Sequence, residues 1–222
     1  MSIRLMCRCV QIQLRKYRML CYTVENEKRI GCSVMYKICH TKESAQRQRE
    51  LERGLLDALG RQPYDKITLT DLCRELQIPR KTFYRYFPVK DDCLLALIDH
   101  TLSDCNDIAL KGWEGSGNLD ASVQLRFFRF WKAHSAFLDA VRDNGLEYLL
   151  LERTTVIVDC MKENAEPESF ARNQVEYFVA HGLMNTVLRW HRYGFQSTPE
   201  EMAAVFGRLL DKAELPVNRL LL

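Results

Sequence analysis

The stretch that decides the fold is residues 67–87, which read ITLTDLCRELQIPRKTFYRYF. Asp71 follows Thr68 at the spacing of a helix N-cap and the acid of its capping box, although that box normally uses Glu or Gln. We therefore predict a helix from Thr68 to about residue 76. A short break follows, and Pro79 suits the first turn of a further helix that ends near residue 87. Two helices joined by so short a turn are typical of a helix-turn-helix.

The second of these helices has two different faces. Phe83 and Phe87 are four residues apart and face the same way, so we expect them to be buried. Arg and Lys can donate to guanine in the major groove, and Tyr and Thr hydroxyls suit phosphates or base edges. The outward rows carry such side chains and no acid: Arg80 with Tyr84, and Lys81 with Arg85.

The net charge of the chain, +3, is a poor guide to DNA binding. Residues 1–40 hold eight basic and two acidic side chains, residues 41–105 hold eleven of each, and residues 106–222 hold thirteen basic and sixteen acidic. The basic surplus therefore lies in the N-terminal segment. Only a local patch on the helix-turn-helix could attract phosphate within the folded body.

Residues 67–94 closely resemble the DNA-binding domain of the TetR family of transcription regulators. That family has a Thr-capped second helix, a turn, a helix with the pattern Thr-Phe-Tyr-x-Tyr/His-Phe, and then Lys followed by acids. The matching residues here are Thr68, Thr82-Phe83-Tyr84, Tyr86-Phe87 and Lys90-Asp91-Asp92. The resemblance is specific over about residues 45–105 and looser beyond them.

Two positions depart from the family pattern. Gln77 stands in the turn where the family usually has Gly, so it would have to adopt an uncommon backbone conformation if the turn needs a positive φ. Pro79 stands where Ser or Thr usually caps the recognition helix; it lacks a capping side chain but fixes φ for the first turn. Neither change removes the motif.

The resemblance implies a set of DNA contacts, carried over by position. The start of the recognition helix would meet base edges, its tyrosines would touch the backbone or bases, and Lys90 would hold a phosphate. The start of the preceding helix often touches phosphate in the family. With the outward Arg85, the predicted set is Thr68, Thr70, Arg80, Lys81, Thr82, Tyr84, Arg85, Tyr86 and Lys90.

The remaining sequence predicts an all-α protein. We expect a three-helix DNA-binding domain over residues 45–105 and a helical ligand-binding and dimerisation domain over 106–222, after a Gly-rich loop near 112–118. The apolar residues recur at intervals of three and four in a series of segments. The expected helices are about 50–60, 68–76, 79–87, 90–102, one stripe over 123–141, 146–162, 168–193 and 199–213.

The resemblance also implies a homodimer and a small-molecule effector. Family members pair through their last two long helices, here about 168–193 and 199–213, with Gly182 permitting close approach. Their effector binds inside the second domain, although each aromatic side chain there also suits ordinary core packing. Candidate pocket residues are Phe127, Trp131, His134, Tyr148, Phe178 and His181. We expect a repressor that the effector releases from a palindromic operator, although the residues do not distinguish repression from activation.

The first 40 residues are basic and hold five of the nine cysteines. A zinc site built from Cys7, Cys9, Cys39 and His40 does not have the spacing of the usual zinc pairs. We interpret residues 1–34 as an upstream extension, either untranslated because Met35 is the start or disordered in the protein. A basic arm that holds DNA phosphates is the alternative.

Other classes of protein fit less well. The chain has no nucleophile elbow, phosphate-binding Gly-rich loop or zinc-ligand pair, so we expect no enzyme activity, no cofactor and no metal. It has no long apolar run and no secretory signal, which favours a cytoplasmic protein. Two alternatives stay open: a co-regulator of the same fold that binds a protein partner instead of DNA, and a helical enzyme.

Overall fold

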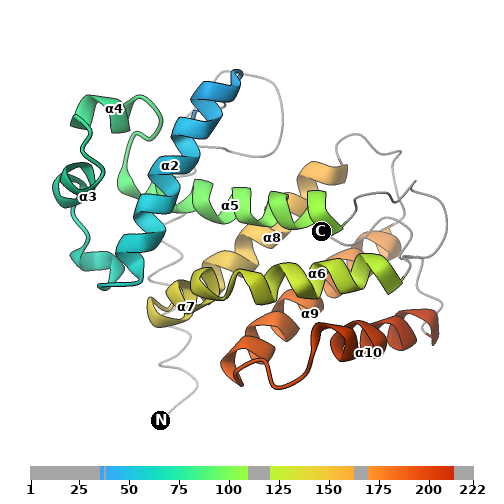
Figure 1. Ribbon diagram of the computed structural model, residues 1–222. Coiled ribbons are helices and arrows are strands. Elements are labelled where there is room, and N and C mark those ends of the chain that lie inside the picture. Colours follow the sequence, from blue (N-terminus) through green and yellow to red (C-terminus); the bar gives the residue numbers. More distant parts are fainter. Residues whose placement is uncertain (1–35, 38, 110–120, 163–169, 213–222) are drawn as a thin grey trace, which may run out of the picture. The chain divides into compact units, whose positions relative to one another are not determined.

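A computed structural model describes residues 36, 37, 39–109, 121–162 and 170–212. The regular secondary structure in these ranges is all helical, and they contain no strand, as predicted (Figure 1). The Gly-rich loop and the first 35 residues, with the Met35 start and the basic arm, lie outside the described residues. The elements are α2 (Lys42–Leu59), the 3₁₀ turn η1 (Tyr64–Lys66), α3 (Leu69–Glu75), α4 (Arg80–Tyr84), α5 (Lys90–Ala109), α6 (Ala121–Ala133), α7 (Ser135–Asp143), α8 (Glu147–Lys162), α9 (Phe170–Arg192) and α10 (Pro199–Lys212).

Helix α2 is longer than the sequence pattern predicted. It begins after Thr41, whose hydroxyl accepts from the Ser44 amide at 3.2 Å, and it ends at Gly60 as expected. The prediction missed its first two turns because residues 42–49 hold no large apolar side chain, and the residue they bury most is Gln48. Glu52, inside the predicted range, is also almost fully buried. Partners satisfy both side chains: Gln48 donates to the Lys37 carbonyl, and Glu52 accepts from His100. Where a helix buries satisfied polar residues, the periodicity of its apolar residues does not reveal the buried face.

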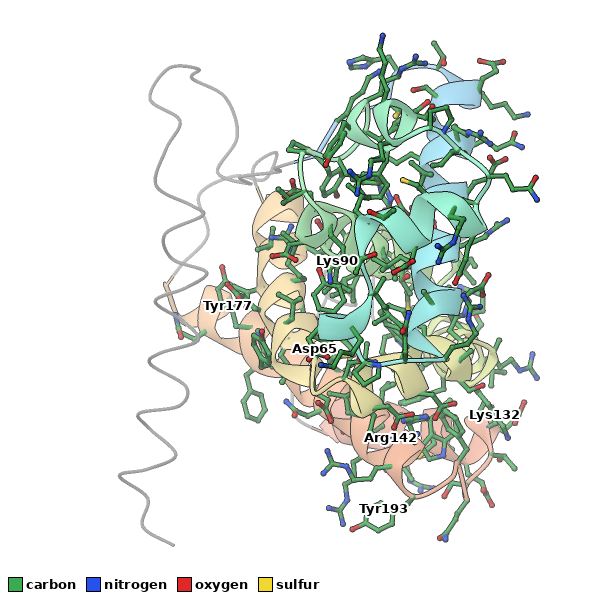
Figure 2. The ribbon with its side chains drawn as sticks, turned by 90° about the vertical axis from the view of Figure 1, so that its left-hand side faces the viewer. Asp65, Lys90, Lys132, Arg142, Tyr177 and Tyr193 are labelled. Atoms are coloured by element: carbon green, nitrogen blue, oxygen red, sulfur yellow. The ribbon has the colours of Figure 1, made fainter. Side chains whose placement is uncertain are left out.

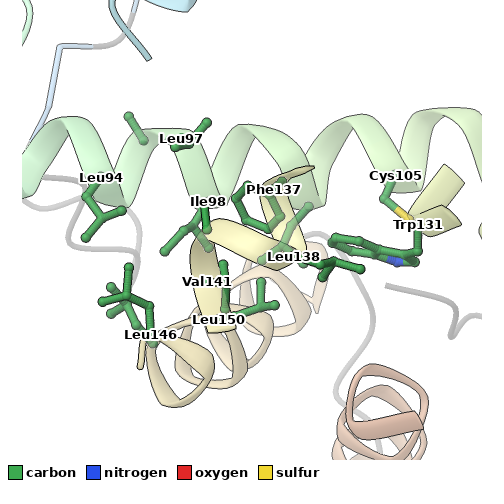
Figure 3. Packing of buried hydrophobic residues seen from close by; sticks show 14 of the residues in the cluster. Leu94, Leu97, Ile98, Cys105, Trp131, Phe137, Leu138, Val141, Leu146 and Leu150 are labelled. Atoms are coloured by element: carbon green, nitrogen blue, oxygen red, sulfur yellow. The ribbon is translucent and has the colours of Figure 1, made fainter. Parts of the chain in front are cut away.

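Helix α5 lies between two groups of helices. The first group is α2 to α4, and the second group is α6 to α10 (Figure 1). Helix α5 packs against α2, which contacts α3, and against α6 and α8 (Figure 1). Its buried side chains include Leu94, Ile98 and Cys105, and α6, α7 and α8 supply side chains on the other side of the core (Figure 3). Residues 34–222 belong to one compact unit. A boundary between two domains at residue 105 stays a prediction.

The stripe predicted over 123–141 is two helices instead of one. The chain breaks at His134, whose φ is −99° and ψ is 31°, between α6 and α7. Its ring contacts the Phe130 carbonyl through Nδ1 at 2.8 Å and stacks on the Phe130 ring with centroids 3.8 Å apart. The His134 amide donates both to that carbonyl at 3.0 Å and to the Trp131 carbonyl at 3.2 Å, as is common where a helix ends. The helices predicted over 146–162, 168–193 and 199–213 match α8, α9 and α10 within two residues at each end.

None of the described helices is both long enough and apolar enough to cross a membrane.

Candidate nucleic-acid interface

Helix α3 begins at the predicted cap. The Thr68 hydroxyl oxygen accepts from the Asp71 amide at 3.1 Å, as an N-cap residue does. The Asp71 carboxylate binds the Thr68 hydroxyl at 2.6 Å and also pairs with Arg74. The shorter Asp side chain therefore closes the box on the Thr68 hydroxyl instead of on its backbone amide. This cap sets where α3 begins and leaves Thr68 and Thr70 exposed beside the recognition helix.

The turn between α3 and α4 has the positive φ that the sequence analysis considered for Gln77. Gln77 has a φ of 51°, in the left-handed region that favours glycine, and its side chain is exposed. The Ile78 amide donates to the Cys73 carbonyl at 2.9 Å, which closes the end of α3. An L-residue in this region costs about 1–3 kcal/mol, so surrounding contacts must hold the turn.

One such contact is a close approach of α2 to the residue that ends α3. A Cβ at Gly54 would lie 2.5–2.9 Å from side-chain atoms of Leu76, so only glycine allows this packing without a shift. The sequence analysis did not single out Gly54. A glycine inside a helical pattern was the signal, because it lowers helix stability and persists where two elements meet closely.

The inner face of the recognition segment, which we define as residues 79–87, is buried as predicted. Phe83 and Phe87 have no exposed surface, and their ring centroids lie 5.4 Å apart. Leu72 of α3 is also buried, and Leu76 and Ile78 pack against this core. Helix α4 itself spans only five residues, so these aromatic contacts hold it in place more than its own backbone hydrogen bonds do.

The outer face is the basic surface that the sequence predicted. Arg80, Lys81 and Arg85 are exposed, and Tyr84 is 53% exposed. The Arg80 guanidinium contacts the Thr70 hydroxyl, which brings the start of α3 and the start of α4 together. Thr82 is half-buried on the border of this face. A cationic surface with one exposed tyrosine matches the side chains that bind phosphates and base edges.

Two predicted DNA-contacting residues have other surroundings than expected. Tyr86 is only 6% exposed, because its ring packs on the core beside Phe87 and under the Lys37 ammonium. Lys90 donates through Nζ to the carbonyls of Tyr64 and Ile67 at 2.7 and 2.8 Å. Burial lowers the pKa of Lys90 despite the opposing influence of Asp91. Both side chains therefore have structural partners within the chain.

Lys90 also lies 3.9 Å from the centroid of the Tyr64 ring, so the η1 turn encloses it on two sides. Figure 2 shows Lys90 beside the turn that carries Asp65, with Lys132 and Tyr193 lower in the same view. The family pattern of Lys followed by acids thus has a local explanation: the Lys caps two carbonyls, and the Asp92 carboxylate accepts from the Val89 amide at 3.1 Å.

The candidate pocket residues differ in their surroundings. Phe127 and Trp131 are fully buried and pack edge-to-face, with His134 near them at the α6–α7 break. Tyr148 is half-buried on α8. His181 of α9 bonds to Thr155 of α8 at 3.0 Å. Phe178 is 75% exposed, which places it on the outside of α9 instead of in an interior pocket.

The predicted dimerisation helices divide into a covered and an uncovered side. Val179 and Trp190 of α9 are buried within the chain. Phe178 and, on α10, Val205 are exposed by 75% and 50%, and no atom lies within 4 Å of a Cβ placed on Gly182. Val175, Leu209 and Leu210 belong to the same predicted stripes, but their side chains lie outside the described ones. Part of each stripe is therefore ordinary core, and part is open apolar surface.

The residues that the structure describes contain no group of three His, Cys, Asp or Glu side chains placed to hold a metal. Cys39, from the rejected zinc pattern, instead lies with its Sγ 2.9 Å from the Gln48 amide oxygen. Cys7 and Cys9 lie outside the described residues.

The comparisons with known proteins agree with this geometry. The family described as bacterial regulatory proteins, tetR family, matches residues 55–97, from α2 to the first half of α5. A solved structure described as "Dihydroxyacetone kinase operon activator DhaS" has a similar fold, with a TM-score of 0.50 and 18% sequence identity over 77% of this chain and 97% of that chain. No curated protein matches the chain significantly in sequence.

Proposed function

We propose that the chain is a homodimeric repressor of the tetR type, which binds a palindromic operator through residues 68–87 and leaves it when a small ligand binds. The match of residues 55–97 to the tetR family of bacterial regulatory proteins supports DNA-binding regulation by a protein that is not an enzyme. The observation that carries the proposal is the exposed face of Arg80, Lys81, Tyr84 and Arg85, which the buried Phe83 and Phe87 hold outward.

The proposed interface is smaller than the set predicted from sequence. Arg80, Lys81, Thr82, Tyr84 and Arg85 would enter the major groove, and the exposed Thr68 and Thr70 would contact phosphate. Tyr86 and Lys90 would not contact DNA themselves. They would hold the recognition segment and the start of α5 in position. A second copy would place an identical face on the other half-site, one helical turn or so along the duplex.

The uncovered sides of α9 and α10 support the dimer. An exposed Phe178, an open Gly182 and a half-exposed Val205 form the kind of apolar surface that a second copy covers. The effector would act by binding one arrangement of the second domain better than another, which is the only way a ligand shifts an equilibrium. Phe127 and Trp131 are the candidate lining residues nearest to the interior core.

The decisive experiment selects binding sites for the full chain from random duplex DNA and measures affinity in a salt titration. We expect a palindromic consensus. Lys81→Ala and Tyr84→Ala should each weaken binding by about tenfold or more while far-UV circular dichroism stays native, because a good base or phosphate contact contributes about 1–3 kcal/mol. Lys81→Ala should also reduce the salt slope by about one.

The matched control is Lys132→Ala, which removes the same charge from the exposed end of α6, away from the helix-turn-helix (Figure 2). It should leave affinity within about twofold, since surface charges beyond a Debye length are screened. Unchanged affinity in both Lys81→Ala and Tyr84→Ala would reject this recognition helix. Failure to select any DNA would favour the co-regulator that binds a protein partner.

The direction of regulation needs a separate measurement. The solved structure of similar fold is named an operon activator, whereas we propose repression. A reporter gene downstream of the selected operator should be expressed less when the chain is present. Higher expression would make the protein an activator and leave the DNA-binding part of the proposal standing.

A further inference from the structure

Asp99 of α5 receives hydrogen bonds from two distant parts of the chain. Its carboxylate is almost fully buried and accepts from Arg153 of α8 twice, from Nε and from a terminal nitrogen, each at 2.6 Å. The Tyr36 hydroxyl, which precedes α2, donates to the same carboxylate at 3.0 Å. One buried charge on the helix between the two groups of helices thus joins α8 to the segment before α2.

The segment before α2, which we call the strap (Tyr36, Lys37, Cys39 and His40), is attached to the end of the recognition segment. The Lys37 amide donates to the Tyr86 carbonyl at 3.1 Å. The Tyr36 ring centroid lies 6.4 Å from that of Phe87 and 5.6 Å, edge-on, from that of His100. Any displacement of Tyr36 therefore acts on the residues that hold the outward face of α4 in position.

Arg153 connects the same carboxylate to the second group of helices. It lies on α8, and two residues later Thr155 bonds to His181 of α9. Its side chain is 12% exposed, and the Asp99 side chain is 6% exposed. A shift of α8 against α5 would have to break this two-pronged contact, because a planar guanidinium keeps both bonds in only one orientation.

The surroundings of Tyr36 and Arg153 favour the protonated form of each side chain. Burial raises the pKa of Tyr36, and the adjacent Asp99 carboxylate raises it further, so the hydroxyl stays protonated and donates. For Arg153, burial acts to lower the pKa, but the bonds to Asp99 outweigh it and the pKa is raised. Breaking the pair would leave a buried charge without its partner, which is strongly unfavourable.

The strap also has room to move. A cavity of about 280 Å³ lies between it and the helices α2 and α5, lined by Tyr36, Lys37 and Cys39 on one side and by Gln48, Arg49 and His100 on the other. On the side of this cavity Tyr36 can move without displacing a core side chain, while its other side packs beside Phe87.

We propose that the side chains Arg153, Asp99 and Tyr36 couple α8 to the recognition segment, so that a shift of α8 releases Tyr36 and loosens the end of α4. The regulatory consequence, lower affinity for DNA, rests on the proposed function. The structural part does not, because it concerns contacts within one chain.

The test is amide hydrogen exchange of the full chain without DNA. Arg153→Lys keeps the charge but loses the two-pronged contact, and Tyr36→Phe keeps the ring but loses the hydroxyl. Each should speed exchange over residues 80–87 by about threefold or more relative to residues 127–131 of α6. The double variant should exchange only slightly faster than the faster single variant, because the effects of substitutions within one network are not additive.

Arg142→Lys is the matched control. Its exposed ion pairs with Asp139 and Asp143 lie within α7, outside both the network and the reference residues, and it should leave residues 80–87 unchanged. Unchanged exchange there in Arg153→Lys, equal acceleration over 127–131, or fully additive effects in the double variant would each overturn the coupling. With the selected DNA, both single variants should bind about three- to tenfold more weakly. If the wild-type chain selects no DNA but the exchange pattern is as expected, the proposed function fails and the coupling stands.

Discussion

Phe83 and Phe178 show how two regions of this molecule differ. Both are phenylalanines in helices, yet Phe83 of α4 has no exposed surface and Phe178 of α9 is 75% exposed. Around Phe83, a few residues of local sequence determine which face is buried, because Phe87 and Leu72 are close in the chain. Around Phe178, the apolar stripe runs past the intrachain core, and the other helices cover only part of it. An apolar periodicity thus indicates that a face will be covered, without indicating by which partner.

The largest expected difference between the two regions is in the free energy of unfolding when the phenylalanine ring is removed from each. Phe83→Ala should lower the free energy of unfolding by about 3–5 kcal/mol, because it opens a cavity in a close-packed core. Phe178→Ala should change it by less than about 0.5 kcal/mol, as exposed substitutions do. Urea denaturation at a concentration where the chain is monomeric measures both. Similar losses in the two variants would contradict the comparison.

The next effect concerns the uncovered face. Phe178→Asp should weaken self-association by about tenfold or more if this face holds the dimer, because central aromatic contacts dominate such interfaces. Sedimentation velocity across a concentration series measures the change. Ile108→Asp is the control, since Ile108 is 46% exposed on α5, outside the proposed dimer face. An equal effect of both substitutions would remove Phe178 from the dimer interface.

A smaller effect tests how the region around Phe83 is held. Lys90→Met should lower the free energy of unfolding by about 1–3 kcal/mol, because two carbonyl groups lose their donor. Lys66→Met is its counterpart in the same turn, where the side chain is 72% exposed and pairs with Asp65 only at 3.9 Å. It should cost less than about 0.5 kcal/mol. Thermal denaturation at neutral pH compares the two, and equal shifts would show that Lys90 is not a structural cap.

The smallest expected effect has the opposite sign. Gln77→Gly should stabilise the chain by about 1 kcal/mol, because glycine accepts a positive φ without strain. Gln77→Ala keeps the Cβ and should bring no gain. If DNA binding requires the strained turn, the glycine variant will be more stable but bind more weakly. Stabilisation by alanine as well would mean that the Gln side chain, and not the backbone conformation, is the cause.

The sequence predicted the helix-turn-helix well because its signals lie close together. The Thr68 cap depends on Asp71, three residues later, and the burial of Phe83 depends on Leu72 and Phe87, which are close in the chain. It did not reveal that Tyr86 and Lys90 have partners within the chain, because these partners, the strap and the η1 turn, are not part of the motif. The resemblance carries over positions, but a side chain's surroundings also depend on the residues that pack over it.

The second group of helices was predicted in outline and not in detail. The bounds of α8, α9 and α10 were close to those expected, since caps such as Thr198 with Glu201 are local. The break at His134 and the exposure of Phe178 were missed. Both depend on which helix packs against which, and the sequence pattern is the same for a covered face and an open one.

By itself, the sequence determined that the chain is helical, where the recognition helix begins, and that its outer face is basic, because capping and periodicity act over one or two turns. Only the tertiary structure decided that Lys90 caps a neighbouring turn, that part of α9 stays uncovered, and that Asp99 joins Tyr36 to Arg153. The last two partners are 63 and 54 residues from Asp99. Contacts over such distances in the chain arise from the packing of whole helices, which no short pattern encodes.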